Sequence, residues 1–433
     1  MRIPSDLPSV SFRARIHLNQ SFVRAFSVLG AFILLVLVSS PAVAQNAPAA
    51  GIARLTVKSS VLGEDRPILV RTPVGYETNN QSYPVLYMTD GDAHLGHTAS
   101  TIEFLARNGR ISETIVVAIP NTDRTRDLSP TKPDTKGATG APQFPTAGGA
   151  DNFLKFIETE LIPDIEKRYR VRPYRTLAGH SLGGLFAIHA LLSRPEVFQS
   201  YVAVSPALQW DNQVTVKRAE DFFKNRKELN ATLFVSLGDE PGGIEDGFHQ
   251  FKQVLAKTQV KGFDWDAQQW SDEDHGSIVL RSHYVGLRKI YDGWQMPRDR
   301  DMGTIAGGLK GADEHYRKLS EKFRYEIQVP EAMVNMLGYQ SLQGGKADEA
   351  IAIFKRNVER YPASANVYDS LAEAYETLGK LELAAPLYEK ASTLGQKNND
   401  PNAALFAANF TRASEKLKQA AAKPAEPVKK SQQ

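Results

Sequence analysis

A serine flanked by glycines lies near the middle of this 433-residue chain. The short apolar run Thr176–Ala178 is followed directly by Gly179-His180-Ser181-Leu182-Gly183-Gly184. A Gly-x-Ser-x-Gly segment between a strand and a helix is typical of a nucleophile on a strained turn, where glycine has no Cβ to keep strand and helix apart. The alternative is a helix N-cap serine, which also lies where a strand turns into a helix. The glycines on both sides favour a nucleophile.

A serine hydroxyl is a weak nucleophile at neutral pH and needs a base within hydrogen-bonding distance. The best candidate is His275, which follows the last predicted strand within Asp272–Ser277 and opens the final helix of this region. Histidine can accept and return a proton near neutrality. A helix-start cap is the alternative role for His275. The other candidate bases are weaker, because one lies inside the glycine-flanked turn and two lie in helices: His180, His189 and His283.

An acid is needed to hold the imidazole in one tautomer and to stabilise its charged form. Gly238-Asp239-Glu240 follows the predicted strand Thr232–Leu237. We prefer Glu240, followed by Asp239 and then Glu245. The glycine-rich loop between Glu240 and Glu245 can aim any of the three, so spacing alone leaves the choice open.

Two backbone N–H groups would stabilise an oxyanion formed at this serine. One is that of Leu182, at the start of the helix after the nucleophile, where N–H groups are free. The other is that of Asp92, in the loop Asp90–His94 after the predicted strand Pro84–Thr89, where Gly91 permits the turn. The acids and histidine of this loop lack the partner ligands of a metal site, so we expect no metal and no cofactor.

Arg124 and Arg126 follow the predicted strand Thr114–Ile119 at its carboxyl end, where α/β folds bind ligands. Their guanidinium groups could hold an anionic part of a substrate. Equally, one of the two arginines could pair with Asp123 or Asp127 and order the long loop. Both interpretations stay open.

Strand-like and helix-like runs alternate from about residue 53 to 294, which predicts an α/β fold with a mostly parallel sheet. Continuous β-branched runs such as Ile115–Ile119 indicate strands covered on both faces. No helix separates the first two strands, so we expect an antiparallel hairpin at one edge. We read residues 122–150 as a substrate-covering loop or as disordered. The predicted strands are Arg54–Leu62, Pro67–Thr72, Pro84–Thr89, Thr114–Ile119, Thr176–Ala178, Tyr201–Val204, Thr232–Leu237 and Asp264–Gln268; the predicted helices are Asn152–Tyr169, Leu185–Leu192, Val214–Phe223, Gly247–Leu255 and Ser277–Tyr291.

The first 44 residues have the pattern of a bacterial signal peptide. Four arginines precede the apolar run Val28–Val38, and Ala42-Val43-Ala44 forms a cleavage site. An uncleaved membrane anchor is the alternative. We expect a mature protein that begins at Gln45, is periplasmic or secreted, and keeps no stable membrane anchor.

Charge and cysteine content exclude several classes of function. Residues 1–44 contain four arginines and one aspartate, a net charge of +3, which equals the +3 of the whole chain. The mature protein is therefore near neutral, which argues against nucleic acid as a partner. The absence of cysteine excludes disulfides, thiolate metal sites and a cysteine nucleophile.

Residues 330–417 contain an internal repeat of 34 residues, the tetratricopeptide period. The paired positions include Gly338 with Ala372 and Phe354 with Tyr388. Helices around Ala312–Arg324 and Asn402–Leu417 should cap the two units. The predicted organisation is a signal peptide at 1–44, a catalytic domain at 51–294, a linker and helix at 295–329, repeats at 330–417 and a disordered tail at 418–433. A chain ending at about Gly311 should keep a folded catalytic core.

The chain order serine, acid, histidine is that of the α/β-hydrolases. The motifs together resemble the branch of that superfamily containing the ferric-siderophore esterases and the mycolyltransferases. The resemblance covers about residues 53–294 and rests on Asp90-Gly91-Asp92, Asn121–Pro130, Gly179–Gly184, Ser205–Trp210 and Asp272–Gly276.

The resemblance implies ester hydrolysis by Ser181 and His275. We therefore expect an α/β-hydrolase domain followed by an all-α tetratricopeptide-like segment, acting as an exported serine ester hydrolase on a small-molecule ester through an acyl-enzyme. One alternative is an acyltransferase with the same residues. Another is a scaffold protein whose repeats bind a protein or peptide beside a vestigial hydrolase domain.

Overall fold

The computed structural model describes residues 51–137, 139–299 and 304–422. The predicted signal peptide at 1–44 lies outside these ranges. Among the described residues, no helix is both long enough and apolar enough to cross a membrane.

A mixed eight-stranded sheet forms the centre of the α/β part, in the order β1-β2-β4-β3-β5-β6-β7-β8. β1 pairs antiparallel with β2, as the hairpin prediction required, and β2 is antiparallel to β4. All later pairings are parallel. Every strand overlaps a predicted one; the observed bounds are β1 Ile52–Ser59, β2 Glu64–Arg71, β3 Tyr83–Met88, β4 Ile115–Ala118, β5 Val171–His180, β6 Ser200–Val204, β7 Glu228–Leu237 and β8 Lys261–Gln269.

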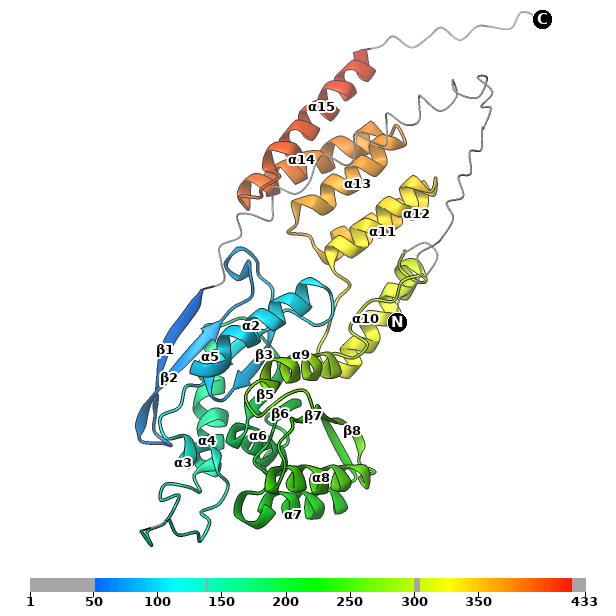
Figure 1. Cartoon of the computed structure of the whole chain (residues 1–433). Helices are drawn as coiled ribbons and strands as arrows, with labels where there is room; N and C mark the ends of the chain where they lie inside the picture. Colours follow the sequence, from blue (N-terminus) through cyan, green and yellow to red (C-terminus); the bar gives the residue numbers. More distant parts are fainter. Residues whose placement is uncertain (1–50, 138, 300–303, 423–433) are drawn as a thin grey trace, which may run out of the picture. The chain divides into compact units, whose positions relative to one another are not determined.

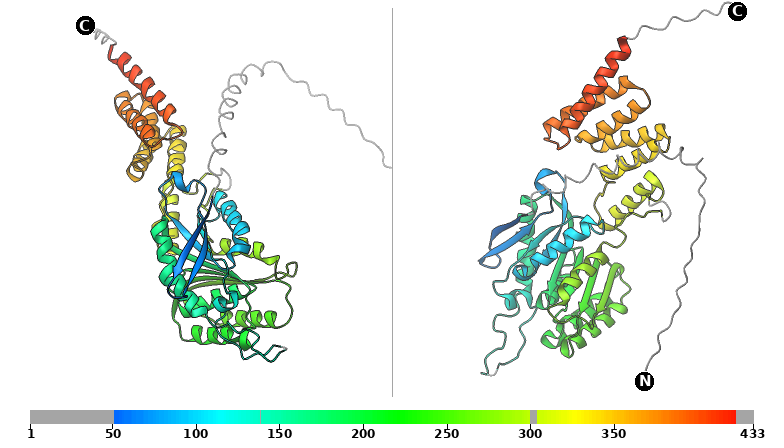
Figure 2. Two further views of the ribbon diagram at one scale, coloured as in Figure 1. Left: turned by 90° about the vertical axis from the view of Figure 1, so that its left-hand side faces the viewer. Right: turned by 45° about the horizontal axis from the view of Figure 1, so that its top comes forward.

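Two apolar cores lie on the two faces of the sheet, because side chains alternate along each strand. In β3, Tyr87 belongs to one core and its neighbour Leu86 to the other. Figures 1 and 2 show the helices on both faces. The first core is covered by α4 (Ala150–Phe156), α5 (Ile162–Arg168), α6 (Leu182–Ser193), α7 (Trp210–Lys224) and α8 (Gly243–Ala256), and the second by α2 (Gly91–Arg107), α9 (Ile278–Ile290) and part of α10 (Gly308–Phe323).

Two helices were not predicted from the sequence. The segment expected to be a loop at Asp90–His94 is the start of the 17-residue helix α2. Its buried face is built largely from glycine, alanine and threonine, so the usual pattern of large apolar residues is weak. Helix α3 (Arg124–Leu128) lies in the stretch 122–150, where the Asp123 side chain caps it by accepting a hydrogen bond from the Arg126 N–H.

The C-terminal region is all-helical within the described residues. Helices α11 (Glu331–Gln343) and α13 (Ala365–Thr377) begin 34 residues apart, and so do α12 (Ala347–Arg360) and α14 (Leu381–Lys397). Gly345 and Gly379, also 34 apart, have φ values of 73° and 71° just after the first helix of each pair. The sequence repeat is therefore a repeat of helix pairs.

Small residues allow the two helices of each pair to approach closely. A Cβ on Gly338 would lie 2.5 Å from the Phe354 ring. The matching residues of the second pair, Ala372 and Tyr388, are buried in one apolar cluster. The last helix, α15, spans Ala403–Ala422. Residues 418–422, predicted as part of a disordered tail, are therefore helical, in keeping with the helix preference of alanine, lysine and glutamine.

Helix α10 contributes to two apolar clusters. Phe323 is buried in the core beneath α9, where its ring centroid lies 4.9 Å from that of Tyr174 and 5.0 Å from that of Tyr291. At the other end of the helix, Ala312 is buried in a cluster with Leu337 of α11. The segment predicted as a linker and cap is thus part of the apolar core of the α/β part as well.

Candidate active site

Ser181 occupies a sharp turn between β5 and α6. Its φ of 59° and ψ of −115° are unusual for a residue with a side chain. The Ser181 N–H donates to Val204 O at 2.9 Å, and the Ser181 carbonyl accepts from the Leu185 N–H at 2.9 Å and the Ala207 N–H at 3.1 Å. The Ser181 side chain makes no capping hydrogen bond to α6. Ser181 is half-buried on a strained turn, and its side chain does not act as a helix N-cap.

The glycines beside Ser181 are required by close contacts. A Cβ on Gly179 would lie 2.2 Å from Gly183 O, and a Cβ on Gly183 would lie 2.2 Å from Thr89 Oγ1. Both distances are far too short for any side chain. The sequence pattern therefore reflects the tight passage of the chain from strand to helix.

Glu240 and His275 are hydrogen-bonded through Oε2 and Nδ1. Glu240 follows the end of β7, and His275 lies between β8 and α9. The other carboxylate oxygen of Glu240 accepts from Ser205 Oγ at 2.5 Å and from the Gly238 N–H at 3.1 Å. With Nδ1–H directed at the carboxylate, Nε2 of His275 is left to exchange a proton with another group.

The residue Glu240 is 8% exposed, yet the pKa of its carboxyl group lies below the ordinary value of 4.5. Burial alone raises the pKa, but the hydrogen bonds from His275, Ser205 and the Gly238 N–H outweigh it. Glu240 is therefore ionised at neutral pH and suited to stabilise an imidazolium.

The two alternative acids do not contact His275. The Asp239 side chain is exposed, and its N–H donates to Glu273 O at 2.7 Å. Glu245 accepts from Gln269 Nε2 at 2.8 Å. Of the three acids that spacing left open, the structure brings Glu240 to the histidine.

The N–H groups predicted for an oxyanion hole belong to residues at the starts of α2 and α6. The Gly91 N–H donates to Ile119 O and the Ala93 N–H to Asp90 O, both at 3.0 Å. The N–H groups of Asp92 and Leu182 have no hydrogen-bond partner in the described ranges. A Cβ on Gly91 would lie 2.7 Å from the Ala118 carbonyl carbon, so glycine is needed to bring this helix start against β4.

Arg124 is held by groups of the protein itself. Its Nε donates to Asp90 Oδ1 at 2.6 Å, and Nη2 donates to Asp90 Oδ2 at 3.2 Å and to His180 O at 3.1 Å. Asp90 is buried, and its pKa is lowered, because the bonds from Arg124 and Asn121 outweigh the effect of burial. Arg124 therefore connects the start of α2 to the residue before Ser181.

Arg126 is paired in the same way. It donates to Glu64 Oε1 at 2.6 Å and to Asp127 Oδ1 at 2.7 Å. The bond from Arg126, with smaller contributions from Arg66 and Thr122, lowers the pKa of Glu64 to about 2. The bond from Arg126 to Asp127 is the pairing that the structural alternative predicted for one arginine. Arg124 is paired as well, but with Asp90, which was not predicted.

Ser205 is a site residue to which the sequence analysis gave no role. Its φ is 39°, its N–H donates to Ser236 O at 2.8 Å, and its hydroxyl holds the Glu240 carboxylate. Two signals in the sequence pointed to it: its position directly after β6, and the motif Ser205–Trp210 that contributes to the family resemblance. Within the described part of the chain, no group of three or more histidine, aspartate or glutamate side chains is placed to hold a metal ion.

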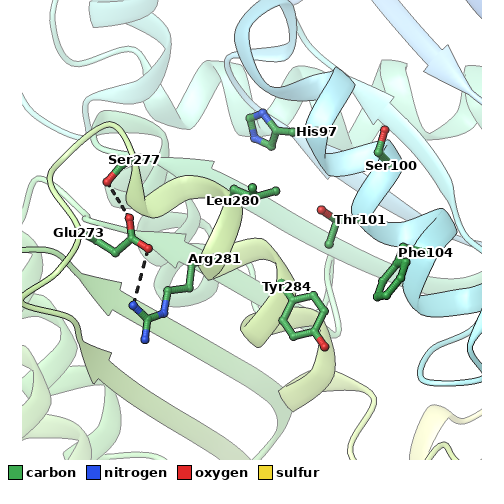
Figure 3. A pocket seen from close by; sticks show the side chains of 9 residues that line it. All are labelled: His97, Ser100, Thr101, Phe104, Glu273, Ser277, Leu280, Arg281 and Tyr284. Carbon is green, nitrogen blue, oxygen red and sulfur yellow. Dashed lines mark hydrogen bonds and ion pairs between the residues drawn. The ribbon is translucent and has the colours of Figure 1, made fainter.

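Figure 3 shows a pocket of about 870 Å³ between α2 and α9. Glu273 lies two positions before His275 and Ser277 two positions after it. Both form part of the pocket wall, and the Ser277 hydroxyl donates to Glu273 Oε2 at 2.7 Å. Ser181 and His275 do not line it. The full lining is His97, Ser100, Thr101, Phe104, Glu273, Ser277, Leu280, Arg281 and Tyr284.

Comparison with known proteins covers the region that contains these residues. Residues 59–275 match the family model "Esterase", described as "Putative esterase". A siderophore enterobactin esterase of Emericella nidulans is 38% identical over 246 residues, which cover 47% of this chain and 80% of that protein. A siderophore triacetylfusarinine C esterase of Aspergillus fumigatus is 32% identical over 276 residues, which cover 54% of this chain and 90% of that protein.

Among solved structures, an IroE-like serine hydrolase from Shewanella oneidensis has a TM-score of 0.61 and 26% identity. The match covers 72% of this chain and all of that one. The family match spans half of the chain and includes Ser181, Glu240 and His275. The chain belongs to the esterase family.

Proposed function

We propose that this protein is a serine carboxylic-ester hydrolase that works through an acyl-enzyme, with Ser181 as nucleophile, His275 as base and Glu240 as the acid that orients His275. The observation that carries the proposal is the buried, ionised Glu240 bound to His275 Nδ1, in the same site as a serine whose backbone is strained. Family membership independently supports ester hydrolysis.

In the first half of the reaction, His275 Nε2 takes the proton of the Ser181 hydroxyl as Oγ attacks the ester carbonyl carbon. The resulting oxyanion accepts hydrogen bonds from the N–H groups of Asp92 and Leu182. Collapse of this intermediate breaks the carbon–oxygen bond of the ester. The alcohol leaves with the proton from His275, and Ser181 keeps the acyl group.

In the second half, water gives a proton to His275 and attacks the acyl-enzyme. The carboxylic acid leaves and Ser181 recovers its proton. In an acyltransferase, an alcohol would replace water at this step, and every protein residue would be the same. Analysis of the products therefore separates the two activities.

We further propose siderophore-type esters as the first substrates to test, because the relatives named above are siderophore esterases. Arg124 and Arg126 are occupied by internal carboxylates, so nothing in the site requires an anionic substrate. Small neutral esters are the second class to test.

The decisive experiment uses purified protein beginning at Gln45. Enterobactin and triacetylfusarinine C, each with and without iron, are compared with p-nitrophenyl esters of increasing acyl length, and products are identified by mass spectrometry. We expect release of acid and alcohol by the unaltered protein and no release by Ser181→Ala. Equal turnover by both proteins contradicts the role of Ser181, and no turnover of any ester contradicts the proposal and favours the scaffold alternative.

Export and the tetratricopeptide identity of the helix pairs are separate proposals. Cleavage after Ala44 is tested by the mass of the protein recovered from the periplasm or medium of a bacterial host. The 34-residue spacing of α11–α14 supports the tetratricopeptide assignment. Binding of a protein or peptide by these helices stays a prediction.

A further inference from the structure

The residue before the nucleophile contacts the loop that carries the base. His180 is the last residue of β5, and its Nε2 lies 2.7 Å from the main-chain oxygen of His275. The two imidazole rings lie 4.5 Å apart between centroids. The contact joins positions 95 residues apart in the sequence.

The chemistry of this contact fixes the tautomer of His180. A carbonyl oxygen only accepts hydrogen bonds, so His180 Nε2 carries the proton and donates it. Burial, together with the charge that His275 can carry, lowers the pKa of His180 to about 4. His180 is therefore neutral at pH 7, and it does not oppose the positive charge that forms on His275 during turnover.

The other hydrogen bonds that fix the loop around His275 are made by residues before and after it. The Asp239 N–H donates to Glu273 O at 2.7 Å, and the Gly276 N–H donates to Asp274 Oδ1 at 2.8 Å. The His275 side chain is 45% exposed and is fixed at Nδ1 by Glu240. The bond from His180 is thus a second fixed point, on the main chain of His275 itself.

We propose that His180 is a positioning residue: its Nε2–H, bound to the His275 carbonyl, holds the His275 imidazole where its Nε2 can exchange a proton with Ser181. The inference rests on the proposed function. His180 directly precedes Ser181, so the same short segment places the nucleophile and fixes the base. A misplacement of about 1 Å between reacting groups costs about 100-fold in rate.

The test compares His180→Phe, which keeps a ring and loses the donor, with His180→Gln, which keeps an N–H at a similar reach. We expect His180→Phe to lower kcat by about 10- to 100-fold with little change in KM. His180→Gln should recover most of the lost kcat. His97→Phe is the matched control, because it alters another ring of the histidine cluster that does not contact His275.

Circular dichroism and thermal unfolding establish that each variant is folded. If His180→Phe does not fold, His180→Gln is compared with His180→Asn, whose amide is one methylene shorter; a lower kcat for asparagine supports the proposal. Equal kcat for the phenylalanine or asparagine variant and the glutamine variant overturns it. Substantial activity in Ser181→Ala would instead overturn the proposed function, so the two failures are distinguishable.

Discussion

Glu240 is buried and ionised, and three hydrogen-bond donors stabilise its charged carboxylate. The Gly238 N–H and the Ser205 hydroxyl bind one oxygen, which leaves the other for His275. The orientation of the imidazole thus depends on residues from two different strand ends. Removing the carboxylate charge leaves the hydroxyl and the N–H with a poorer acceptor and the imidazole without a counter-charge.

Ser181→Ala and His275→Ala should each lower esterase kcat by about 10⁴-fold or more, because the nucleophile and the base act in one step. The double variant should lose little beyond either single variant. Steady-state kinetics on a p-nitrophenyl ester measures all three. A Ser181→Ala protein that kept half of the original rate would exclude this mechanism.

Glu240→Gln should lower kcat by about 10³- to 10⁴-fold, less than the loss of Ser181, because the oxyanion hole and nucleophile remain. Asp239→Asn and Glu245→Gln are matched controls that each remove one nearby carboxylate, and they should stay close to the unaltered rate. If Asp239→Asn proved the severe change, another acid would orient His275 in solution.

At this scale the sequence singled out Ser181 and His275 as candidates, but it could not decide which of the neighbouring acids contacts His275. Ser181 and His275 are recognisable because a glycine-flanked serine and a histidine after the last strand have few other roles. The choice of Glu240 depends on how the loop after β7 turns, which is set by contacts such as that with Ser205. The pairing of Arg124 with Asp90 likewise depends on the tertiary fold.

At the scale of elements, α2 and α9 are joined by a buried polar contact. His283 Nδ1 lies 2.8 Å from Thr98 Oγ1, whose hydroxyl donates to His94 O. Burial lowers the pKa of His283 from 6.5 to about 3. His97, whose ring centroid lies 5.8 Å from that of His283, also has a lowered pKa because it is partly buried.

The lowered pKa of the buried His283 predicts that the folded protein is less stable at acidic pH. Below pH 6.5 the imidazole of His283 is protonated in the unfolded state but stays neutral in the folded state. The free energy of unfolding therefore decreases as the pH is lowered, until the pH reaches the pKa of the folded state. His283 alone should account for about 2 kcal/mol between pH 6.5 and 5. Urea unfolding of the unaltered protein and of His283→Asn, which keeps a donor near Nδ1, measures the difference. Parallel pH profiles would contradict the prediction.

The elements themselves were predictable to different degrees. The strands are continuous apolar or β-branched segments, so all eight were located, although β5 and β7 extend further than predicted. Helix α2 was missed because small residues and threonines form much of its buried face. A helix that packs closely on a sheet needs small residues on its buried face. These residues weaken the periodic pattern of large apolar side chains by which a helix is recognised in a sequence.

At the scale of the whole molecule, the position of α10 changes the C-terminal boundary at which the α/β part can be truncated and still fold. Ending the chain after Gly311 would remove Leu319 and Phe323, which are 4% and 1% exposed, from the core beneath α9. Loss of the phenylalanine alone should cost about 3 to 5 kcal/mol. The earlier expectation of a folded core ending at Gly311 is therefore revised.

We expect protein 45–328 to unfold at nearly the temperature of the longer chain and to keep its esterase activity. Protein 45–311 should unfold at a clearly lower temperature or be recovered in insoluble form. Thermal unfolding followed by circular dichroism, with activity measured on the same samples, compares the two. Equal unfolding temperatures would mean that α10 contributes nothing to the catalytic core.

The sharing of α10 between two clusters also couples the stability of two distant regions. Ala312 packs in a cluster with the first helix pair, whereas the Phe323 ring contacts Tyr174 and Tyr291 of the α/β part. Unfolding of the whole helix exposes apolar surface in both clusters. A molecule that bound only the folded helix pairs would therefore also suppress opening of the core beneath α9, by mass action and without contacting the catalytic residues.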